Sequence, residues 1–313
     1  MRSDNRILDL AVIIPAYNEA QRIGGCIDSI REALEYAEVT DAEVIVVDDE
    51  SADDTSDVAR AHGAVALRQS RRQGPLAAWT RGVADSSASL LCFVDADCRV
   101  DKAAFAALLA GFARPTVGVA AARAELDSRR TGNSMVERSA TFSALILHEI
   151  KSRLDNDTFM PIGRMMAVRR AAWQKGDHRW PCDLVMASRA KEAGWEISYR
   201  PDAVVYYQPV GTYKELRSDF LRTRIGQALL GDLVKPLPRG VVGRAAFASL
   251  RRQPLNAAAW LALRARLWSE RSRGRLRLDE GYARWDRHPE NPQYPTRSTQ
   301  SHRAPEEQTG SLA

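Results

Sequence analysis

The sequence predicts an α/β protein in which helices flank a mostly parallel β-sheet, followed by a helical extension at the C-terminal end. Short apolar runs alternate with segments of helical periodicity through the first 100 residues, the order that produces a parallel sheet covered by helices. The apolar runs are uninterrupted rather than alternating in polarity, as is typical of strands buried on both faces. Hydrophobic residues make up 45% of the 313 residues, which is enough for a sizeable core.

Four strands are expected in the first 100 residues. Residues 10–15 form an apolar strand that ends at Pro15, whose nitrogen cannot donate to a sheet ladder. Residues 17–36 then turn into a helix with isoleucines at helical spacing, as in an amphipathic helix. Further strands are expected at 43–47, 64–67 and 90–94, with helices through about residue 62 and over 76–84.

The remainder of the chain continues this alternation and ends in helices. We expect helices at 103–114, 134–154, 170–175 and 183–193, and strands at 117–124, 163–168, 195–199 and 203–207. Gly194 suits the position that follows a helix. Residues 241–252 and 255–271 are expected to be helical, whereas 288–313 are polar, proline-rich and without periodicity, as is typical of a disordered tail.

The net charge of +5 is unevenly distributed. Residues 214–287 contain 17 Lys and Arg against 7 Asp and Glu, an excess of +10, so the remainder carries about −5. This asymmetry indicates an acidic half and a basic part that faces anionic lipid, a phosphorylated acceptor or nucleic acid. The four cysteines show no CxxC or metal-ligand spacing, and no segment resembles a signal peptide or a membrane span. We therefore expect a reduced, cytoplasmic protein.

Acidic residues follow two of the apolar strands. Asp48 and Asp49 come after the strand at 43–47, and Asp95 and Asp97 come after the strand at 90–94. The carboxyl ends of parallel strands meet at one edge of a sheet, where α/β proteins bind ligands. Paired carboxylates repel each other unless a cation lies near them, and hard oxygen ligands suit Mg²⁺ or Mn²⁺. The alternative is that these acids simply begin solvated loops.

Two phosphate-binding motifs are absent from the sequence. No GxGxxG follows a strand and no GxxxxGK[ST] is present, which excludes a dinucleotide fingerprint and a P-loop. Nucleotide binding through carboxylates and a metal ion therefore remains. Nothing resembles a base-reading helix or a stacking platform, so we expect no nucleic-acid partner.

In their order and spacing, these segments resemble the successive signatures of family 2 glycosyltransferases. The matching segments are IIPAYNE (13–19), VVDDESAD (46–53), GPLAA (74–78), FVDAD (93–97), and later 183–194 and 201–203. The resemblance implies the inverting chemistry and the Rossmann-like GT-A fold of that family. It places a GT-A domain at 1–225, with a nucleotide-binding half at 1–100 and an acceptor half at 101–225. A basic helical extension at 226–287 and the tail at 288–313 complete the chain.

The resemblance also implies individual roles. Asp49 would accept a hydrogen bond from the base of a uridine nucleotide, and Asp95 would lie against the ribose. Asp97 would hold Mg²⁺ or Mn²⁺ on the diphosphate of a UDP-sugar donor. Asp183 matches the general base that deprotonates the acceptor hydroxyl, as a single displacement requires. The residues expected to border the base and ribose are Pro15, Ala16, Tyr17 and Glu19.

The sequence departs from the family pattern at two positions. Cys182, rather than a second acid, precedes Asp183, and Tyr207 stands where many members have a histidine near the metal or diphosphate. The chain also lacks the Gln-x-x-Arg-Trp motif of polymer-forming members, so we expect transfer of a single sugar. The two departures leave open a non-catalytic nucleotide-sugar-binding or scaffold protein.

Arginines outside these motifs are further candidates for the donor site. Arg72, Arg222 and Arg224 would clamp the diphosphate through bidentate hydrogen bonds, although a solvated helix face explains Arg222 and Arg224 equally well. In the C-terminal helices, tryptophans lie beside clustered arginines, as in helices that lie on a membrane surface. Two hypotheses follow: residues 240–285 contact the inner face of a membrane, where the acceptor is a polyprenyl phosphate, or these helices pack against the catalytic domain.

Overall fold

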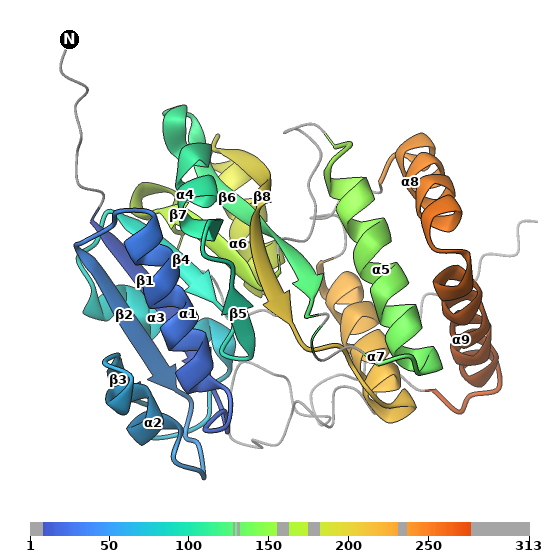
Figure 1. Cartoon of the computed structure of the whole chain (residues 1–313), viewed down its shortest axis with the longest axis horizontal. Helices are drawn as coiled ribbons and strands as arrows, with labels where there is room; N and C mark the ends of the chain where they lie inside the picture. The colour runs from blue at the N-terminus through green and yellow to red at the C-terminus, as the bar shows by residue number, and fades with distance from the viewer. Residues whose placement is uncertain are drawn as a thin grey trace, which may run out of the picture.

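The structure is a computed structural model that describes residues 9–127, 129, 132–154, 163–174, 182–230 and 237–276, with the backbone alone for 182, 222 and 225–230. Within these residues, a curled sheet carries helices on both faces, and a group of longer helices stands beside it (Figure 1). The predicted tail at 288–313 lies outside the described residues. The predicted α/β fold class is confirmed.

The described strands form one sheet in the order β3-β2-β1-β4-β7-β6-β8-β5. Their bounds are β1 (Leu10–Ala16), β2 (Ala42–Asp48), β3 (Val65–Arg68), β4 (Leu90–Val94), β5 (Cys98–Val100), β6 (Val117–Leu126), β7 (Met165–Arg169) and β8 (Glu196–Tyr207). The four strands from β3 to β4 are parallel, and β7 is antiparallel to both of its neighbours, β4 and β6. Because β1, β2 and β4 are parallel neighbours, their carboxyl ends lie at one edge.

Helices cover both faces of this sheet because alternate residues of each buried strand point to opposite sides. On one face, α1 and α4 pack over Leu10 and Val12, and on the other α3 and α6 pack over Ala11 and Ile13. The helices are α1 (Ile23–Tyr36), α2 (Thr55–Ala61), α3 (Pro75–Asp85), α4 (Ala104–Leu109), α5 (Met135–Lys151), α6 (Cys182–Glu192), α7 (Tyr213–Leu230), α8 (Arg239–Arg252) and α9 (Pro254–Ser272). Two 3₁₀ turns, η1 (Ala110–Ala113) and η2 (Arg170–Ala172), follow α4 and β7.

The expected helix at 17–36 begins only at Ile23. In the preceding loop, Asn18 adopts a left-handed φ of 55°, and the backbone N–H of Glu19 donates to Thr55 Oγ1 at 2.8 Å. This loop therefore bonds to the loop after β2 as well as to the start of α1, where the N–H of Ile23 donates to Glu19 O at 2.9 Å. The result places residues 17–20 at the carboxyl edge of the sheet.

Three further expectations need correction. The two strands expected at 195–199 and 203–207 are one strand, β8, whose pairing with β6 shifts register at Ala122/Arg123. The helix expected at 170–175 is only the turn η2, because the backbone becomes extended at Trp173, with φ −70° and ψ 113°. The three-residue strand β5, which pairs antiparallel to β8, was not expected.

The C-terminal helices form a layer with α5 and α7 beside the sheet (Figure 1). Leu263 and Leu267 of α9 join a cluster with Leu216 and Leu221 of α7. The Trp260 ring contacts Phe142 of α5, with centroids 5.8 Å apart. One face of α9 therefore packs against the domain, as one of the two hypotheses for this region requires.

Candidate functional site

The loops after β1 and β2 are hydrogen-bonded to each other at the carboxyl edge of the sheet. The backbone N–H of Asn18 donates to Ser51 Oγ at 2.9 Å, and the N–H of Ala52 donates to Asn18 Oδ1 at 2.8 Å. Pro15 and the buried Ala16 end β1, and Ala16 O accepts from the N–H of Asp49 at 2.8 Å. These bonds make the predicted base and ribose region a continuous polar edge.

Asp48 and Asp49 have different surroundings, although they are adjacent in sequence. Asp48 is fully buried and accepts from the N–H of Ser51 at 2.8 Å and from the hydroxyl of Ser56. These bonds fix the loop at the start of α2. Asp48 is therefore a structural residue.

Asp49 organises the loop between β3 and α3. Its carboxylate accepts from Gln69 Nε2 at 2.8 Å and from the N–H groups of Gln73 and Gly74, both at 2.7 Å. Burial raises its pKa, and the two backbone bonds act in the opposite direction. A carboxylate has about four acceptor positions, so about one is left for a ligand once these three are used.

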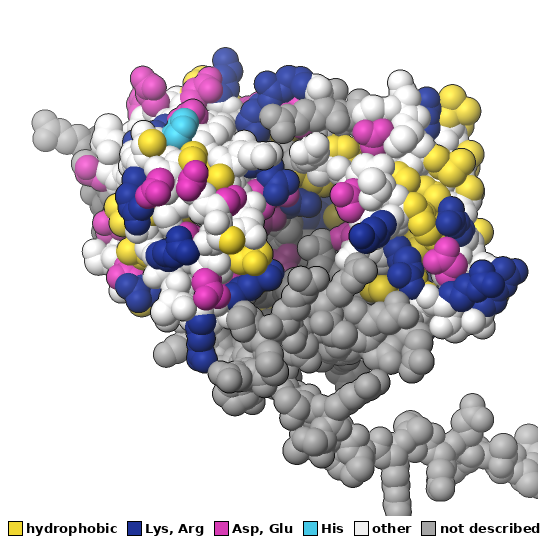
Figure 2. All heavy atoms as spheres, turned by 90° about the horizontal axis from the view of Figure 1, so that it is seen from below, with side chains coloured by type: hydrophobic (Ala, Val, Ile, Leu, Met, Phe, Trp, Pro, Cys, Tyr) yellow, Lys and Arg dark blue, Asp and Glu magenta, His cyan; other side chains and the backbone are white. Residues whose placement is uncertain are grey.

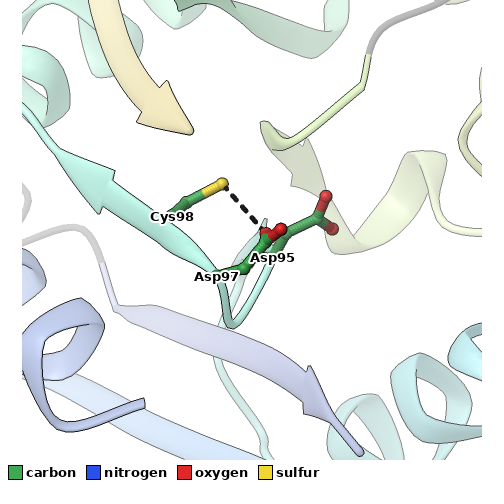
Figure 3. Close-up of side chains that lie close together, drawn as sticks. All are labelled: Asp95, Asp97 and Cys98. Carbon is green, nitrogen blue, oxygen red and sulfur yellow. Dashed lines mark hydrogen bonds between the residues drawn. The ribbon is translucent and has the colours of Figure 1, made fainter. Parts of the chain in front are cut away.

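Asp95 and Asp97 lie in a turn between β4 and β5 (Figure 3). The strand does not continue past Val94, and the N–H of Cys98 donates to Asp95 O at 3.1 Å. This turn, rather than an extended chain, brings one ligand atom from each of Asp95, Asp97 and Cys98 within 4.8 Å of one another. The expectation that two carboxylates meet at this edge is confirmed.

A guanidinium group lies against both carboxylates. Arg164 Nη1 is 3.1 and 3.2 Å from the two oxygens of Asp97 and 3.5 Å from Asp95 Oδ2. Its side chain is only 26% exposed and stacks on the Tyr207 ring, 4.1 Å from the centroid. Burial alone would lower the pKa of Arg164, but the charges of Asp97 and Asp95 raise it overall. Arg164 is a candidate site residue that the motifs did not single out.

The residues at this turn fit a hard divalent cation through oxygen and not through sulfur. Burial and the neighbouring carboxylates raise the pKa of the Cys98 thiol well above its ordinary value, and its Sγ donates to Asp97 Oδ1 at 3.6 Å. Mg²⁺ and Mn²⁺ select carboxylate oxygens over thiols. Two carboxylates against the single charge of Arg164 leave one negative charge in excess, which favours a cation at this turn.

Asp183 is connected to this turn through residues 163 and 164. Asp183 lies in the first turn of α6 and accepts from the N–H of Gly163 at 2.9 Å. The next residue, Arg164, uses its carbonyl to accept from the N–H of Asp95 at 3.0 Å. One short segment of backbone therefore holds Asp183 and the paired acids in the same region.

Two other residues predicted to bind the nucleotide-sugar donor lie apart from each other, Glu19 near Asp97 and Arg72 on the ring of Tyr17. Burial raises the pKa of Glu19, and the charge of Asp97 adds to this effect, although an ion pair with Arg22 at 2.6 Å opposes it. Glu19 therefore lies on the side of Asp97. The guanidinium of Arg72 stacks on the Tyr17 ring, 3.7 Å from its centroid. The backbone N–H of Arg72 donates to Glu50 Oε2 at 2.9 Å.

The predicted arginines of α7 are not brought to the acids by any described contact. Arg224 lies over the Phe220 ring at 5.5 Å, a ring that Arg264 of α9 also contacts. The side chain of Arg222 lies outside the described residues. The role predicted for this pair stays a prediction.

Comparisons with known proteins identify the family to which the chain belongs. Residues 11–176, just over half of the chain, match the family model described as "Glycosyl transferase family 2". The chain is 26% identical over 230 residues to the glycosyltransferase AglE of Haloferax volcanii, a match that covers 70% of this chain and 72% of that protein.

The solved structures that are similar to this one include a mannosyltransferase and a glucosyl-3-phosphoglycerate synthase. The mannosyltransferase PcManGT from Pyrobaculum calidifontis, in complex with GDP-Man and Mn²⁺, has a TM-score of 0.56 at 20% identity, covering 88% of this chain and 82% of its own. Glucosyl-3-phosphoglycerate synthase from Mycobacterium tuberculosis, in complex with Mn²⁺, UDP and phosphoglyceric acid, has a TM-score of 0.50 at 21% identity, covering 72% and 79%. At these identities the likeness establishes the fold, which is the expected GT-A fold.

Proposed function

The chain belongs to glycosyl transferase family 2, and we propose that it is a metal-dependent inverting enzyme that moves one sugar from a nucleotide-sugar donor to an acceptor hydroxyl or phosphate. The observation that carries the proposal is the turn at the end of β4. There, Asp95 and Asp97 converge on one positive charge beside the polar edge formed by β1 and β2. Membership in the family favours an enzyme over the non-catalytic alternative.

The donor side divides between nucleoside and diphosphate. Asp49, with its remaining acceptor position, would bind the N–H of a uracil ring, and Pro15, Ala16 and Tyr17 would border the nucleoside. Asp95 would bind the ribose, with Glu19 on the same side. The similar structures hold UDP in one case and GDP-Man in the other. A UDP-sugar is our first choice because the three donors on Asp49 leave it one acceptor position, which suits the single imide N–H of uracil.

The diphosphate would lie at Asp97. Mg²⁺ or Mn²⁺ held there, with Asp97 as the ligand, would supply Lewis-acid stabilisation of the leaving group. Arg164 is within reach of the same place and would bind the diphosphate oxygens through its fork of N–H donors. Arg72, stacked on Tyr17, is the second arginine at this edge.

The acceptor side would be served by Asp183. In an inverting transfer, the acceptor oxygen bonds to the anomeric carbon as the bond from that carbon to the diphosphate breaks. The acceptor hydroxyl passes its proton to a carboxylate oxygen of Asp183. The N–H of Gly163 fixes the orientation of that carboxylate, and a single carboxylate is sufficient, so Cys182 does not prevent the reaction.

A second candidate places the same chemistry at a membrane surface, with polyprenyl phosphate as the acceptor. The observation that favours it is the row of exposed apolar side chains on α8 and α9. Among the described residues, no helix has the length and apolarity needed to cross a bilayer.

Thermal unfolding with nucleotides tests the donor site. UDP with Mn²⁺ should raise the melting temperature of the wild type by several degrees, because ligand at 100 Kd adds about 2.7 kcal/mol to stability and about 1 kcal/mol shifts a chain of this size by about 2 °C. Asp97→Asn should lose the Mn²⁺-dependent shift. Asp57→Asn, an exposed acid on α2, is the matched control and should keep it. No shift with UDP, GDP or dTDP in the wild type would contradict the proposal.

A further inference from the structure

The outward face of α9 is apolar, although a different face of the same helix packs against the domain. Leu255, Leu261 and Trp268 are 72%, 58% and 72% exposed, and Ala258, Ala262 and Ala265 between them are exposed as well. At 3.6 residues per turn, these positions lie along one side of the helix. The buried residues Leu263 and Leu267 lie on the other side. We define the six exposed residues as the α9 stripe.

The apolar surface continues onto α8. Phe247 is 61% exposed and Leu250 is 45% exposed. Of the ten large hydrophobic residues that are exposed among the described residues, five lie between Phe247 and Trp268. In Figure 2, hydrophobic side chains gather at the end of the molecule where α8 and α9 stand in Figure 1. Such a concentration marks an interaction surface, because soluble surfaces rarely collect large apolar side chains in one place.

Arginines border this apolar surface. Helices α8 and α9 together contain seven arginines and one glutamate, a net charge of +6. Arg271 is exposed on α9 and Arg244 and Arg251 are exposed on α8, whereas Arg266 pairs with Glu270 at 3.3 Å and stacks on a tyrosine ring of α7. The charge of Arg252 is paired with the buried Glu149. Arg244, Arg251 and Arg271 therefore form the basic border of the apolar surface.

We infer that α8 and α9 lie on an anionic lipid bilayer, with the α9 stripe and Phe247 inserted among the headgroups and the bordering arginines against lipid phosphates. An apolar face with aromatic residues and a basic border is the composition of helices that lie in the membrane interface. Each basic residue near an anionic surface adds attraction that falls with ionic strength. A second copy of the chain is a poor occupant, because it would bring a charge of +6 against the same charge. The inference does not rest on the proposed transfer reaction.

Vesicle flotation of the full chain tests this inference. At low salt, the wild type should float with vesicles of phosphatidylcholine and phosphatidylglycerol and stay behind with pure phosphatidylcholine. Leu261→Ser/Trp268→Ser should reduce the fraction bound to anionic vesicles at least tenfold, and Arg251→Gln/Arg271→Gln should reduce it by a smaller factor. The matched control is Tyr36→Ser/Val65→Ser, which removes two equally exposed residues at 55% and 56% from the other end of the chain and should bind as the wild type does.

Three outcomes would overturn the inference. The first is no binding to anionic vesicles at low salt. The second is unchanged binding of Leu261→Ser/Trp268→Ser, which would mean that charge alone holds the protein and nothing inserts. The third is a wild-type dimer in light scattering that becomes a monomer in this variant, which would make the stripe a contact between copies. Nucleotide binding of the same variant, measured by thermal shift, should equal that of the wild type, so failure at the membrane and failure of the donor site are distinguishable.

Discussion

Replacing Arg164 with methionine should tighten the binding of Mn²⁺ to the protein without nucleotide. Arg164 Nη1 lies 3.1 and 3.2 Å from the oxygens of Asp97. A divalent cation that binds Asp97 must therefore displace this guanidinium or share the carboxylate oxygens with it. Hydrogen bonds to charged groups contribute about 1.5–3 kcal/mol, and the lower value suits a pair in which both side chains are 26% exposed. Since about 1.4 kcal/mol is a factor of ten, Kd for Mn²⁺ should fall roughly tenfold.

The assay is a Mn²⁺ titration in which electron paramagnetic resonance reports the free ion. The matched control is Arg60→Met, which removes the same charge from an exposed pair with Asp57 on α2 and should leave Kd within about twofold of the wild type. Tyr207→Leu removes the ring under the guanidinium and should produce a smaller change of the same sign. Unchanged or weaker Mn²⁺ binding in Arg164→Met would refute this account. With Mn²⁺ present, the same variant should bind UDP more weakly if Arg164 also contacts the diphosphate.

Three other predictions follow from the described contacts. Asp183→Asn should lower kcat by about 10²–10⁴-fold, the usual range for a general base, and leave UDP binding unchanged in a thermal-shift assay; equal activity would exclude Asp183 as the base. Ser134→Ala removes the capping box of α5, in which Ser134 and Glu137 bond each other's backbone, and should cost about 1 kcal/mol in urea unfolding. In a Cys182→Ser protein, the other three thiols should stay unreactive towards Ellman's reagent at pH 8 until urea is added, because burial raises the pKa of each.

The fold of the first 100 residues could be predicted from the sequence because the strands there are continuous apolar runs with polar loops between them. The second half was harder for physical reasons. Strand β5 has three residues, and its partner β8 begins about a hundred residues later, so no local pattern indicates it. Strand β8 contains Arg200, Pro201 and Asp202, which break the apolar pattern although the chain stays extended. Arg200 is accommodated because its Nε donates to the Ala107 carbonyl at 3.0 Å.

The site was predictable where it depends on strand ends and not where it depends on pairing between strands. Asp95 and Asp97 follow an apolar run, so their place at the edge could be inferred. Arg164 precedes the strand β7, and only the antiparallel pairing of Val94 with Met165 brings it beside those acids. The one signal in the sequence is an isolated arginine directly before a short apolar strand. Three of the acceptor positions of the Asp49 carboxylate are filled by donors from the loop at 69–74. That loop has no periodic pattern, so the sequence did not indicate these bonds.

Tyr207 connects the departure from the family pattern to the charge balance of the site. Many members have a histidine at this position, whereas here burial raises the pKa of the Tyr207 phenol, so it stays neutral and is a poor ligand for a hard cation. Its ring instead supports the guanidinium of Arg164 at 4.1 Å. Where the resemblance would place a neutral metal ligand, this chain therefore has a ring that supports a positive charge. Because that charge faces the same carboxylates, Arg164 and a divalent ion would compete in the free protein, and a bound diphosphate would offer oxygens to both. The site should therefore bind metal and nucleotide together more readily than metal alone.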